Sequence, residues 1–254
     1  MTGEPVIQVS DLCVAFGDNV VLENVSLDIE EGEVLTILGG SGSGKTTLMR
    51  HMIGLREPQG GSIRVLGRDI ARGGADLEAA RRDMGVAYQS GALFGSLSVL
   101  ENVCLPLQEL TDLPGSACEW IAQLKLRSVG LGQALYRLPS ELSGGMKKRA
   151  AIARAMALDP KILFLDEPSA GLDPITASDL DDLILDLARS LGMTIVVVTH
   201  ELASIFKIAD RAVILDGARR TIVADGPPAE LRDHSDDSFV RRFFRRESSN
   251  ESTG

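Results

Sequence analysis

Short apolar runs that end in polar or glycine-rich sequence dominate the hydrophobic pattern of the chain. They cover residues 34–38, 84–88, 162–165 and 194–199. Because these runs show no alternation of apolar and polar positions, they predict strands buried on both faces, as in a parallel sheet. Residues 6–9 and 25–29 do alternate, which predicts antiparallel strands with one face in water, and residues 62–66 carry a further strand signal.

Helical spacing takes over between residues 91 and 157, where β-branched runs are absent. This stretch predicts an inserted helical subdomain that ends in a helix over residues 146–157. A later helix is predicted to begin at Asp173 and Pro174, which suit the N-cap and the first helical position. The apolar face predicted for that helix consists of Leu180, Leu183, Ile184, Leu187 and Leu191.

Strand and helix signals alternate again over residues 158–216, which completes the pattern of an α/β protein. The predicted units are a core of residues 1–90 and 158–232 that includes the antiparallel strands, an insert of residues 91–157 and a C-terminal tail of residues 233–254. In the tail, Phe239 and Phe243 favour a short helix packed on the body of the protein, with an inter-subunit or membrane-proximal contact as the alternative. Residues 247–254 are expected to be disordered.

Composition narrows the class of protein, the cellular compartment and the binding partners that suit this chain. Its 254 residues are 44% hydrophobic and 24% charged, which suits one large globular domain with or without an inserted subdomain. No run approaches the roughly 18 apolar residues of a membrane span, and no N-terminal signal is recognisable. Three cysteines without metal-ligand spacing indicate a reducing cytosol. The net charge of −10 argues against nucleic acid as a partner and against unaided binding to anionic lipid.

Residues 39–46 read Gly-Gly-Ser-Gly-Ser-Gly-Lys-Thr and fit the phosphate-loop pattern G-x-x-x-x-G-K-[ST]. They stand between the strand predicted over residues 34–38 and a helix predicted over residues 45–53, with Gly54 as its C-cap. Backbone N–H groups of such a loop surround phosphates, and the dipole of the following helix favours the anion. Lys45 is placed to reach the β- and γ-phosphates, and Thr46 to ligate Mg²⁺. The alternative is a Gly/Ser-rich turn before a helix.

Polar side chains follow the other predicted core strands as well. Asp166 and Glu167 end one apolar run, where Asp166 suits Mg²⁺ and Glu167 suits a general base that polarises the attacking water. Gln89 and His200 follow two further runs. Because ligands of open α/β sheets bind at the carboxyl ends of the strands, these side chains are expected to meet the phosphate loop. An acidic turn and a structural histidine are the alternatives.

Residues 142–146 read Leu-Ser-Gly-Gly-Met and open the helix predicted to end at residue 157. Unpaired N–H groups and the helix dipole at such a start suit an anion, while Ser143 also suits an ordinary N-cap. With this motif, the order of elements over residues 6–232 resembles ABC-transporter nucleotide-binding subunits. Phe16 then matches the aromatic that stacks on adenine, and residues 169–173 match the D-loop.

This resemblance implies a P-loop (RecA-like) core with an antiparallel β subdomain, an inserted helical subdomain, and two chains that sandwich two ATP molecules. ATP would contact Phe16, Gly39, Gly40, Ser41, Gly42, Ser43, Gly44, Lys45, Thr46 and Thr47 of one chain and Ser143, Gly144 and Gly145 of the other. The implied catalytic residues are Lys45, Gln89, Glu167 and His200, and the implied Mg²⁺ ligands are Thr46, Gln89 and Asp166. Met146 replaces the family's usual glutamine, which removes a polar contact and keeps the anion donors.

A narrower resemblance concerns the cargo. Met146, residues 91–94 and residues 173–176 are similar to the ATPases of MCE-associated (Mla-type) bacterial lipid transport systems. That likeness implies phospholipid transport through a membrane permease, an MCE-type lipid-binding protein in the complex, and a position at the cytoplasmic face of the inner membrane. Leu93 and Phe94 are expected to contact the permease or to pack inside the insert. An amino-acid or other small-solute importer, a non-transport ABC ATPase and an ATP-binding regulatory module remain alternatives.

Overall fold

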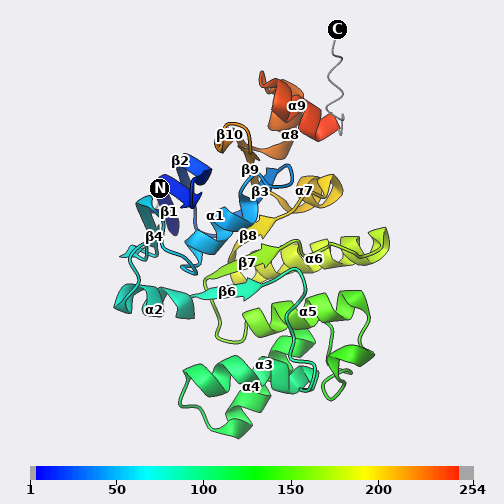
Figure 1. The fold of residues 1–254 in the computed structure, drawn as a ribbon. Helices are drawn as coiled ribbons and strands as arrows, with labels where there is room; N and C mark the ends of the chain where they lie inside the picture. Colours follow the sequence, from blue (N-terminus) through cyan, green and yellow to red (C-terminus); the bar gives the residue numbers. More distant parts are fainter. Residues whose placement is uncertain (1–3, 246–254) are drawn as a thin grey trace.

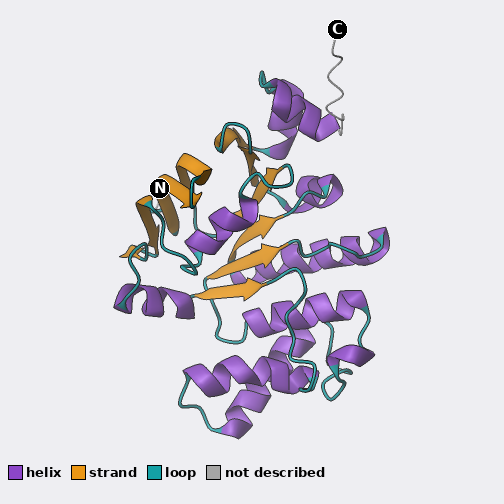
Figure 2. Cartoon of the chain, in the orientation of Figure 1, coloured by secondary structure: helices purple, strands orange, loops and turns teal. Residues whose placement is uncertain are grey.

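A six-stranded sheet with strand order β10-β9-β3-β8-β7-β6 forms the centre of the protein. The structure is a computed structural model that describes residues 4–245. The strands are β3 (Val34–Gly39), β6 (Met84–Ala87), β7 (Ile162–Asp166), β8 (Thr194–Val198), β9 (Arg211–Asp216) and β10 (Thr221–Gly226). Strands β9, β3, β8, β7 and β6 run parallel, while β10 pairs antiparallel with β9. Helices flank the sheet, so β3, β7 and β8 are buried throughout and show no alternation (Figure 2).

A second, antiparallel sheet has the order β2-β1-β4-β5. Its strands are β1 (Ile7–Phe16), β2 (Asn19–Ile29), β4 (Gly60–Val65) and β5 (Arg68–Asp69). Strands β1 and β2 are longer than the alternating stretches of the sequence, because register shifts after Val9, Leu12 and Val14 interrupt the alternation. Strand β5 escapes prediction because two residues are too few to show a period.

Three helices lie together on the β6 side of the central sheet, away from the antiparallel strands (Figure 1). They are α3 (Val99–Leu110), α4 (Gly115–Ser128) and α5 (Gly144–Ala155). Helix α5 lies so close to β6 that a Cβ on Gly85 would stand 2.3 Å from the carbonyl oxygen of Ala155. The other helices before the tail are α1 (Lys45–Met52), α2 (Ala75–Arg82), α6 (Pro174–Leu191) and α7 (Leu202–Ile208).

The helix starts agree with the sequence, whereas two details at the helix ends differ. Ser143 caps α5 and Asp173 caps α6, as predicted. Leu191 is not part of the buried face of α6: it is 58% exposed because it is the last residue before Gly192 turns the chain away. Ile53 is the C-cap of α1, and Gly54, with φ +66°, follows it.

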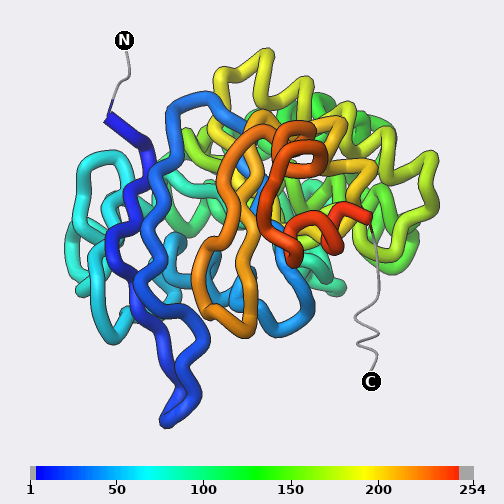
Figure 3. Tube along the Cα trace, turned by 90° about the horizontal axis from the view of Figure 1, so that it is seen from above, coloured from blue at the N-terminus to red at the C-terminus, as the bar shows by residue number. Residues whose placement is uncertain are grey.

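Helix α8 (Pro228–His234) begins before the tail, within the predicted unit of residues 158–232, and lies beside the β9–β10 hairpin (Figure 3). The tail itself forms α9 (Ser238–Arg245), which lies beside the same hairpin. Val240 and Phe244 are its buried anchors, and the Phe244 ring lies 5.6 Å from that of Phe206 on α7. The predicted anchors Phe239 and Phe243 are only partly buried. The expectation of disorder for residues 247–254 concerns residues outside the described part of the chain. Within residues 4–245, no helix is both long and apolar enough to cross a bilayer.

Candidate functional site

Parallel strands bring the predicted polar residues to one edge of the central sheet. The loop at residues 39–46 follows β3, Gln89 follows β6, Glu167 follows β7 and His200 follows β8. Because β6, β7, β8 and β3 are consecutive neighbours in register, their carboxyl ends lie side by side. This is the edge at which open α/β sheets bind ligands.

The phosphate-type loop is shaped by close packing under its glycines. A Cβ on Gly39 would lie 2.4 Å from the Leu215 carbonyl oxygen, and a Cβ on Gly44 would lie 2.7 Å from Leu22 Cδ2. Both glycines have positive φ, +147° and +99°, so no other residue fits either place. The loop runs directly into the start of α1, where no side chain caps the first N–H groups. Such a helix start favours an anion.

Lys45 is the cation of this loop. Its Nζ donates to the carbonyl oxygens of Gly39 and Gly40, at 2.9 Å each. Burial lowers the pKa of this lysine, and the neighbouring carboxylates of Glu167 and Asp166 oppose that shift. The ammonium therefore lies inside the loop and close to both acidic groups.

Glu167 occupies an unusual position at the end of β7. Its φ is +47°, a left-handed backbone conformation that is uncommon for glutamate, and its N–H donates to the Val198 carbonyl oxygen at 2.8 Å. Carboxylate Oε1 lies 2.8 Å from His200 Nδ1. Oε2 is buried and has no hydrogen-bond partner among the described residues. A buried carboxylate oxygen without a donor is a group that would accept a proton or a hydrogen bond from a small ligand.

The oxygen groups beside Glu167 suit a hard divalent cation. Burial, and then the charge of Glu167, raise the pKa of Asp166, while Arg50, Lys148 and Lys45 oppose the shift. Asp166, the Thr46 hydroxyl and the Gln89 amide supply oxygen ligands of the type that Mg²⁺ prefers. In the part of the chain that the structure describes, no three His, Cys, Asp or Glu residues gather as a metal cluster. A cation here would therefore depend on one carboxylate together with substrate phosphates, as is usual for Mg²⁺.

Residues 143–145 do not join the loop within the same chain. A pocket of about 280 Å³ opens over the loop and is lined by Val21, Gly42, Gly44, Lys45, Thr46 and Thr47. The start of α5 instead packs on α6, where a Cβ on Gly145 would lie 2.5 Å from Thr176 Cγ2. Ser143 Oγ accepts from Met146 N at 3.3 Å, and Ser143 and Gly144 are exposed. The helix start is thus open to a ligand or to another molecule.

Phe16 stands at the end of β1 with 44% of its surface exposed. The Arg56 guanidinium carbon lies 5.1 Å from the ring centroid, a cation–π distance that leaves the other ring face available for stacking. Val21, from the same β1–β2 hairpin, lines the pocket over the loop. Phe16 therefore belongs to an element that borders the loop.

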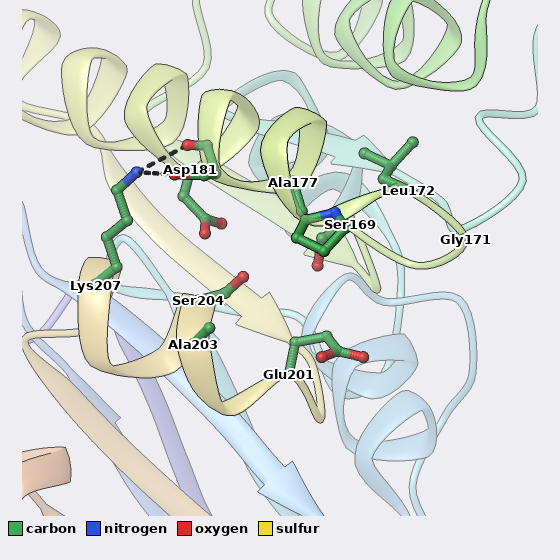
Figure 4. Close-up of a pocket in the computed structure, with 11 residues that line it drawn as sticks. Ser169, Gly171, Leu172, Ala177, Asp181, Glu201, Ala203, Ser204 and Lys207 are labelled. Carbon is green, nitrogen blue, oxygen red and sulfur yellow. Dashed lines mark hydrogen bonds between the residues drawn. The ribbon is translucent and has the colours of Figure 1, made fainter.

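A pocket of about 300 Å³ lies between residues 169–174, α6 and α7 (Figure 4). The sequence gives no sign of it. Asp181 is 4% exposed here, and burial raises its pKa while the Ser204 hydroxyl opposes the shift. Lys207 Nζ donates to the Ser178 carbonyl and hydroxyl oxygens at 2.9 and 2.8 Å. The pocket reaches Glu201, the residue after His200. It therefore adjoins the site at the carboxyl ends of β3, β6, β7 and β8, here called the strand-edge site.

Lys148 is the site residue that sequence reasoning misses. From α5, its Nζ donates to the carbonyl oxygens of Gln89 at 2.5 Å and Glu167 at 3.1 Å. It belongs to the basic run of residues 147–149, and nothing in a single sequence distinguishes it from Lys147. Only the packing of α5 against the strand ends reveals which lysine points inward.

The family model described as ABC transporter matches residues 22–170. The chain belongs to the ABC transporter family. A Haemophilus influenzae protein named intermembrane phospholipid transport system ATP-binding protein MlaF is 41% identical over 243 residues, 95% of this chain and 91% of that protein. A Mycobacterium leprae protein named probable ribonucleotide transport ATP-binding protein mkl is 41% identical over 239 residues, 94% of this chain and 68% of that protein.

A solved structure extends the likeness to three dimensions. It is a dimeric ATP-binding cassette in a post-hydrolysis state bound to ADP and Pi, with a TM-score of 0.78 and 30% identity over 87% of this chain and 98% of that one. The predicted α/β fold with a P-loop core, an antiparallel sheet and a helical group is confirmed. As a member of this family, the chain is an ABC ATPase that binds ATP.

Proposed function

We propose that this chain is the ATP-hydrolysing subunit of a bacterial ABC transporter that moves phospholipid across the cell envelope. The observation that carries the proposal is the 41% identity to MlaF of Haemophilus influenzae over 95% of the chain. The match extends over nearly the whole length of the chain, beyond the segments that carry the nucleotide site. Equal identity to mkl of Mycobacterium leprae, whose name concerns ribonucleotide transport, supports ribonucleotide as the second candidate cargo.

ATP hydrolysis follows from the residues at the strand edge. Lys45 and the N–H groups of residues 39–47 bind the phosphates, and an adenine ring stacks on Phe16. Thr46, Gln89 and Asp166 would hold Mg²⁺, which when bound neutralises charge on the phosphates. Glu167 polarises the attacking water with its free carboxylate oxygen. His200 Nδ1, which lies 2.8 Å from Glu167 Oε1, would orient that carboxylate, and His200 would contact the γ-phosphate.

A second copy of the chain completes each site. Ser143 and Gly144 at the start of α5 are exposed, yet residues 143–145 do not line the pocket over their own loop. If these residues bind the ATP of the partner chain, both their exposure and their absence from the pocket of their own chain are explained. The solved dimeric cassette supports this arrangement. Two ATP molecules would then be enclosed between two chains, and closure of this dimer supplies the mechanical step.

The permease would contact a patch defined as the exposed side chains of Phe94, Tyr136 and Leu138 near the start of α3, which are 52%, 78% and 40% exposed. The Val99 and Leu100 N–H groups donate to the carbonyl oxygens of residues 137 and 135, which brings that loop to the start of α3. Buried Asn102 holds this region rigid, because its amide bonds the backbone N–H and carbonyl oxygen of Phe94 at 2.8 and 3.1 Å. Leu93 instead packs against the core, so Phe94 is the member of the pair that faces outward. Such a patch beside Gln89 suits a permease helix at the cytoplasmic face of the inner membrane, in a complex with an MCE-type lipid-binding protein.

The complex isolated from native membrane tests the cargo. The chain should be purified with its partners, and the bound small molecules should be extracted and identified. Phospholipid together with an MCE-type protein supports the proposal. The lipid assignment is overturned if the complex contains bound ribonucleotide and a soluble receptor in place of the MCE-type protein, and ribonucleotide is then the favoured cargo. A soluble amino-acid receptor in the complex also overturns the lipid assignment.

A further inference from the structure

Helix α5 is hydrogen-bonded to the backbone of the strand-edge site at two points. Lys148 reaches the carbonyl oxygens of Gln89 and Glu167, at 2.5 and 3.1 Å. One and a half turns later, Arg154 donates to the carbonyl oxygens of Gly91 and Ala92, at 3.0 and 2.8 Å. The segment from residue 89 to residue 92 is therefore held by the same helix that begins with Ser143 and Gly144.

Lys148 occupies a place where its charge is needed. The side chain is partly buried, and burial lowers its pKa, while the carboxylates of Glu167 and Asp166 oppose the shift. A partly buried ammonium requires acceptors, and the two carbonyl oxygens supply them. Gly91 and Ala92 have φ of +73° and +47°, which turns the chain so that its carbonyl oxygens face α5.

These contacts join two different ATP sites. The start of α5 serves the nucleotide held by the partner chain, whereas Gln89 and Glu167 serve the chain's own nucleotide. We propose that Lys148 is a positioning residue that couples the orientation of α5 to the backbone of Glu167 in the same chain. A shift of α5 upon closure onto the partner's ATP then moves Gln89 and Glu167 as well. This inference rests on the roles proposed above for Glu167 and Ser143.

The neighbouring lysine provides a matched control. Lys147 stands one position earlier on α5, is partly buried as well, and has no side-chain hydrogen bond or ion pair recorded among the described residues. Lys147→Met and Lys148→Met each remove one positive charge and keep an unbranched side chain that is one atom shorter than lysine. Only the second change removes the two hydrogen bonds to Gln89 and Glu167, so a difference between the variants reports those bonds.

The test compares steady-state ATPase kinetics, ATP affinity and melting temperature for the full-length chain and its variants. Lys148→Met is expected to lower kcat by about tenfold or more, the usual scale for charge-assisted hydrogen bonds, and to leave KM for ATP within about twofold. KM changes little because no group of the chain's own phosphate loop is altered. Lys148→Arg keeps the positive charge and has N–H donors for both carbonyl oxygens, so it is expected to retain most of the wild-type kcat. Lys147→Met is expected to behave like wild type.

The inference is overturned if Lys148→Met has the wild-type kcat, or if Lys147→Met loses as much kcat as Lys148→Met. It is also overturned if Lys148→Arg is as slow as Lys148→Met and the loss of kcat is accompanied by a lower melting temperature. If Lys148→Met does not fold, Lys148→Gln takes its place with the same criteria. Glu167→Gln is measured alongside. If Glu167→Gln keeps full activity, the proposed catalytic site fails; if Glu167→Gln is inactive and Lys148→Met is normal, the coupling role alone fails.

Discussion

Glu167 is the residue on which the proposed chemistry depends most. It combines a left-handed backbone conformation, one carboxylate oxygen beside His200 and one buried oxygen without a partner among the described residues. Strain of this kind at the end of a core strand is costly and persists where the surroundings fix it. The sequence predicts which carboxylate stands at this place, but the conformation and the histidine contact require the folded backbone.

Glu167→Gln is expected to lower kcat by a factor of about 10² or more, because glutamine keeps the shape of the side chain but cannot accept a proton. ATP affinity should change little, since Lys45 and the loop remain. Steady-state ATPase assays and nucleotide titration measure both quantities. Glu109→Gln, the same change at an exposed position of α3, is the control. Hydrolysis near the wild-type rate in Glu167→Gln would remove this residue from the role of base.

Asp181 gives a pH-dependent prediction. Burial raises its folded pKa, so its contribution to stability is full below the unfolded pKa and is lost as pH rises through the folded pKa. Asp181→Asn carries no such loss and should gain melting temperature relative to wild type as pH rises. Thermal unfolding over a pH series measures the difference, with Asp186→Asn at an exposed position of α6 as the control for one lost charge. If the difference in melting temperature between Asp181→Asn and wild type stays constant or becomes smaller toward high pH, Asp181 is not a buried carboxyl that ionises.

At the scale of elements, the contact between the starts of α5 and α6 fixes the position of residues 143–145. Gly145→Ala would bring a methyl group within 2.5 Å of Thr176 Cγ2, an overlap expected to cost roughly 1–3 kcal/mol. Thr176→Ser removes that methyl group and keeps the hydroxyl that bonds Asp173 Oδ2 at 2.6 Å. The melting temperature should fall in the single variant and recover in the double variant. Failure of the second change to restore stability contradicts this packing.

The elements with a clear hydrophobic pattern or a local capping signal could be predicted from the sequence. Core strands such as β7 and β8 are continuous apolar runs, and the caps at Ser143 and Asp173 have a local cause. Strands β1 and β2 were predictable only in part, since register shifts break their alternation. The role of Lys148 could not be predicted, because it depends on the approach of α5 to strands that are remote in sequence.

At the scale of the whole molecule, the exposed side chains around Phe94 are the proposed contact between the ATPase and the permease. Phe94→Ala is expected to reduce the amount of permease that co-purifies from native membrane, or to uncouple transport, while the ATPase of the isolated chain persists. Leu124→Ala removes an apolar side chain of similar exposure, 45% against 52%, from α4 and serves as the control. A complex unchanged by Phe94→Ala would exclude this patch as the permease contact.

The completion of each ATP site by a second copy is the central claim, and a crosslink tests it most directly. One chain carries Gly40→Cys, where a Cβ meets nothing within 4 Å, and a differently tagged chain carries Gly144→Cys, where the nearest atom is Leu172 Cδ2 at 3.3 Å. Both also carry Cys13→Ser, which removes the partly exposed native cysteine and leaves the buried Cys104 and Cys118. We expect a disulfide between the two tagged chains that increases with ATP. The absence of any ATP-dependent link between chains, together with a link within one chain that carries both cysteines, would contradict the shared site.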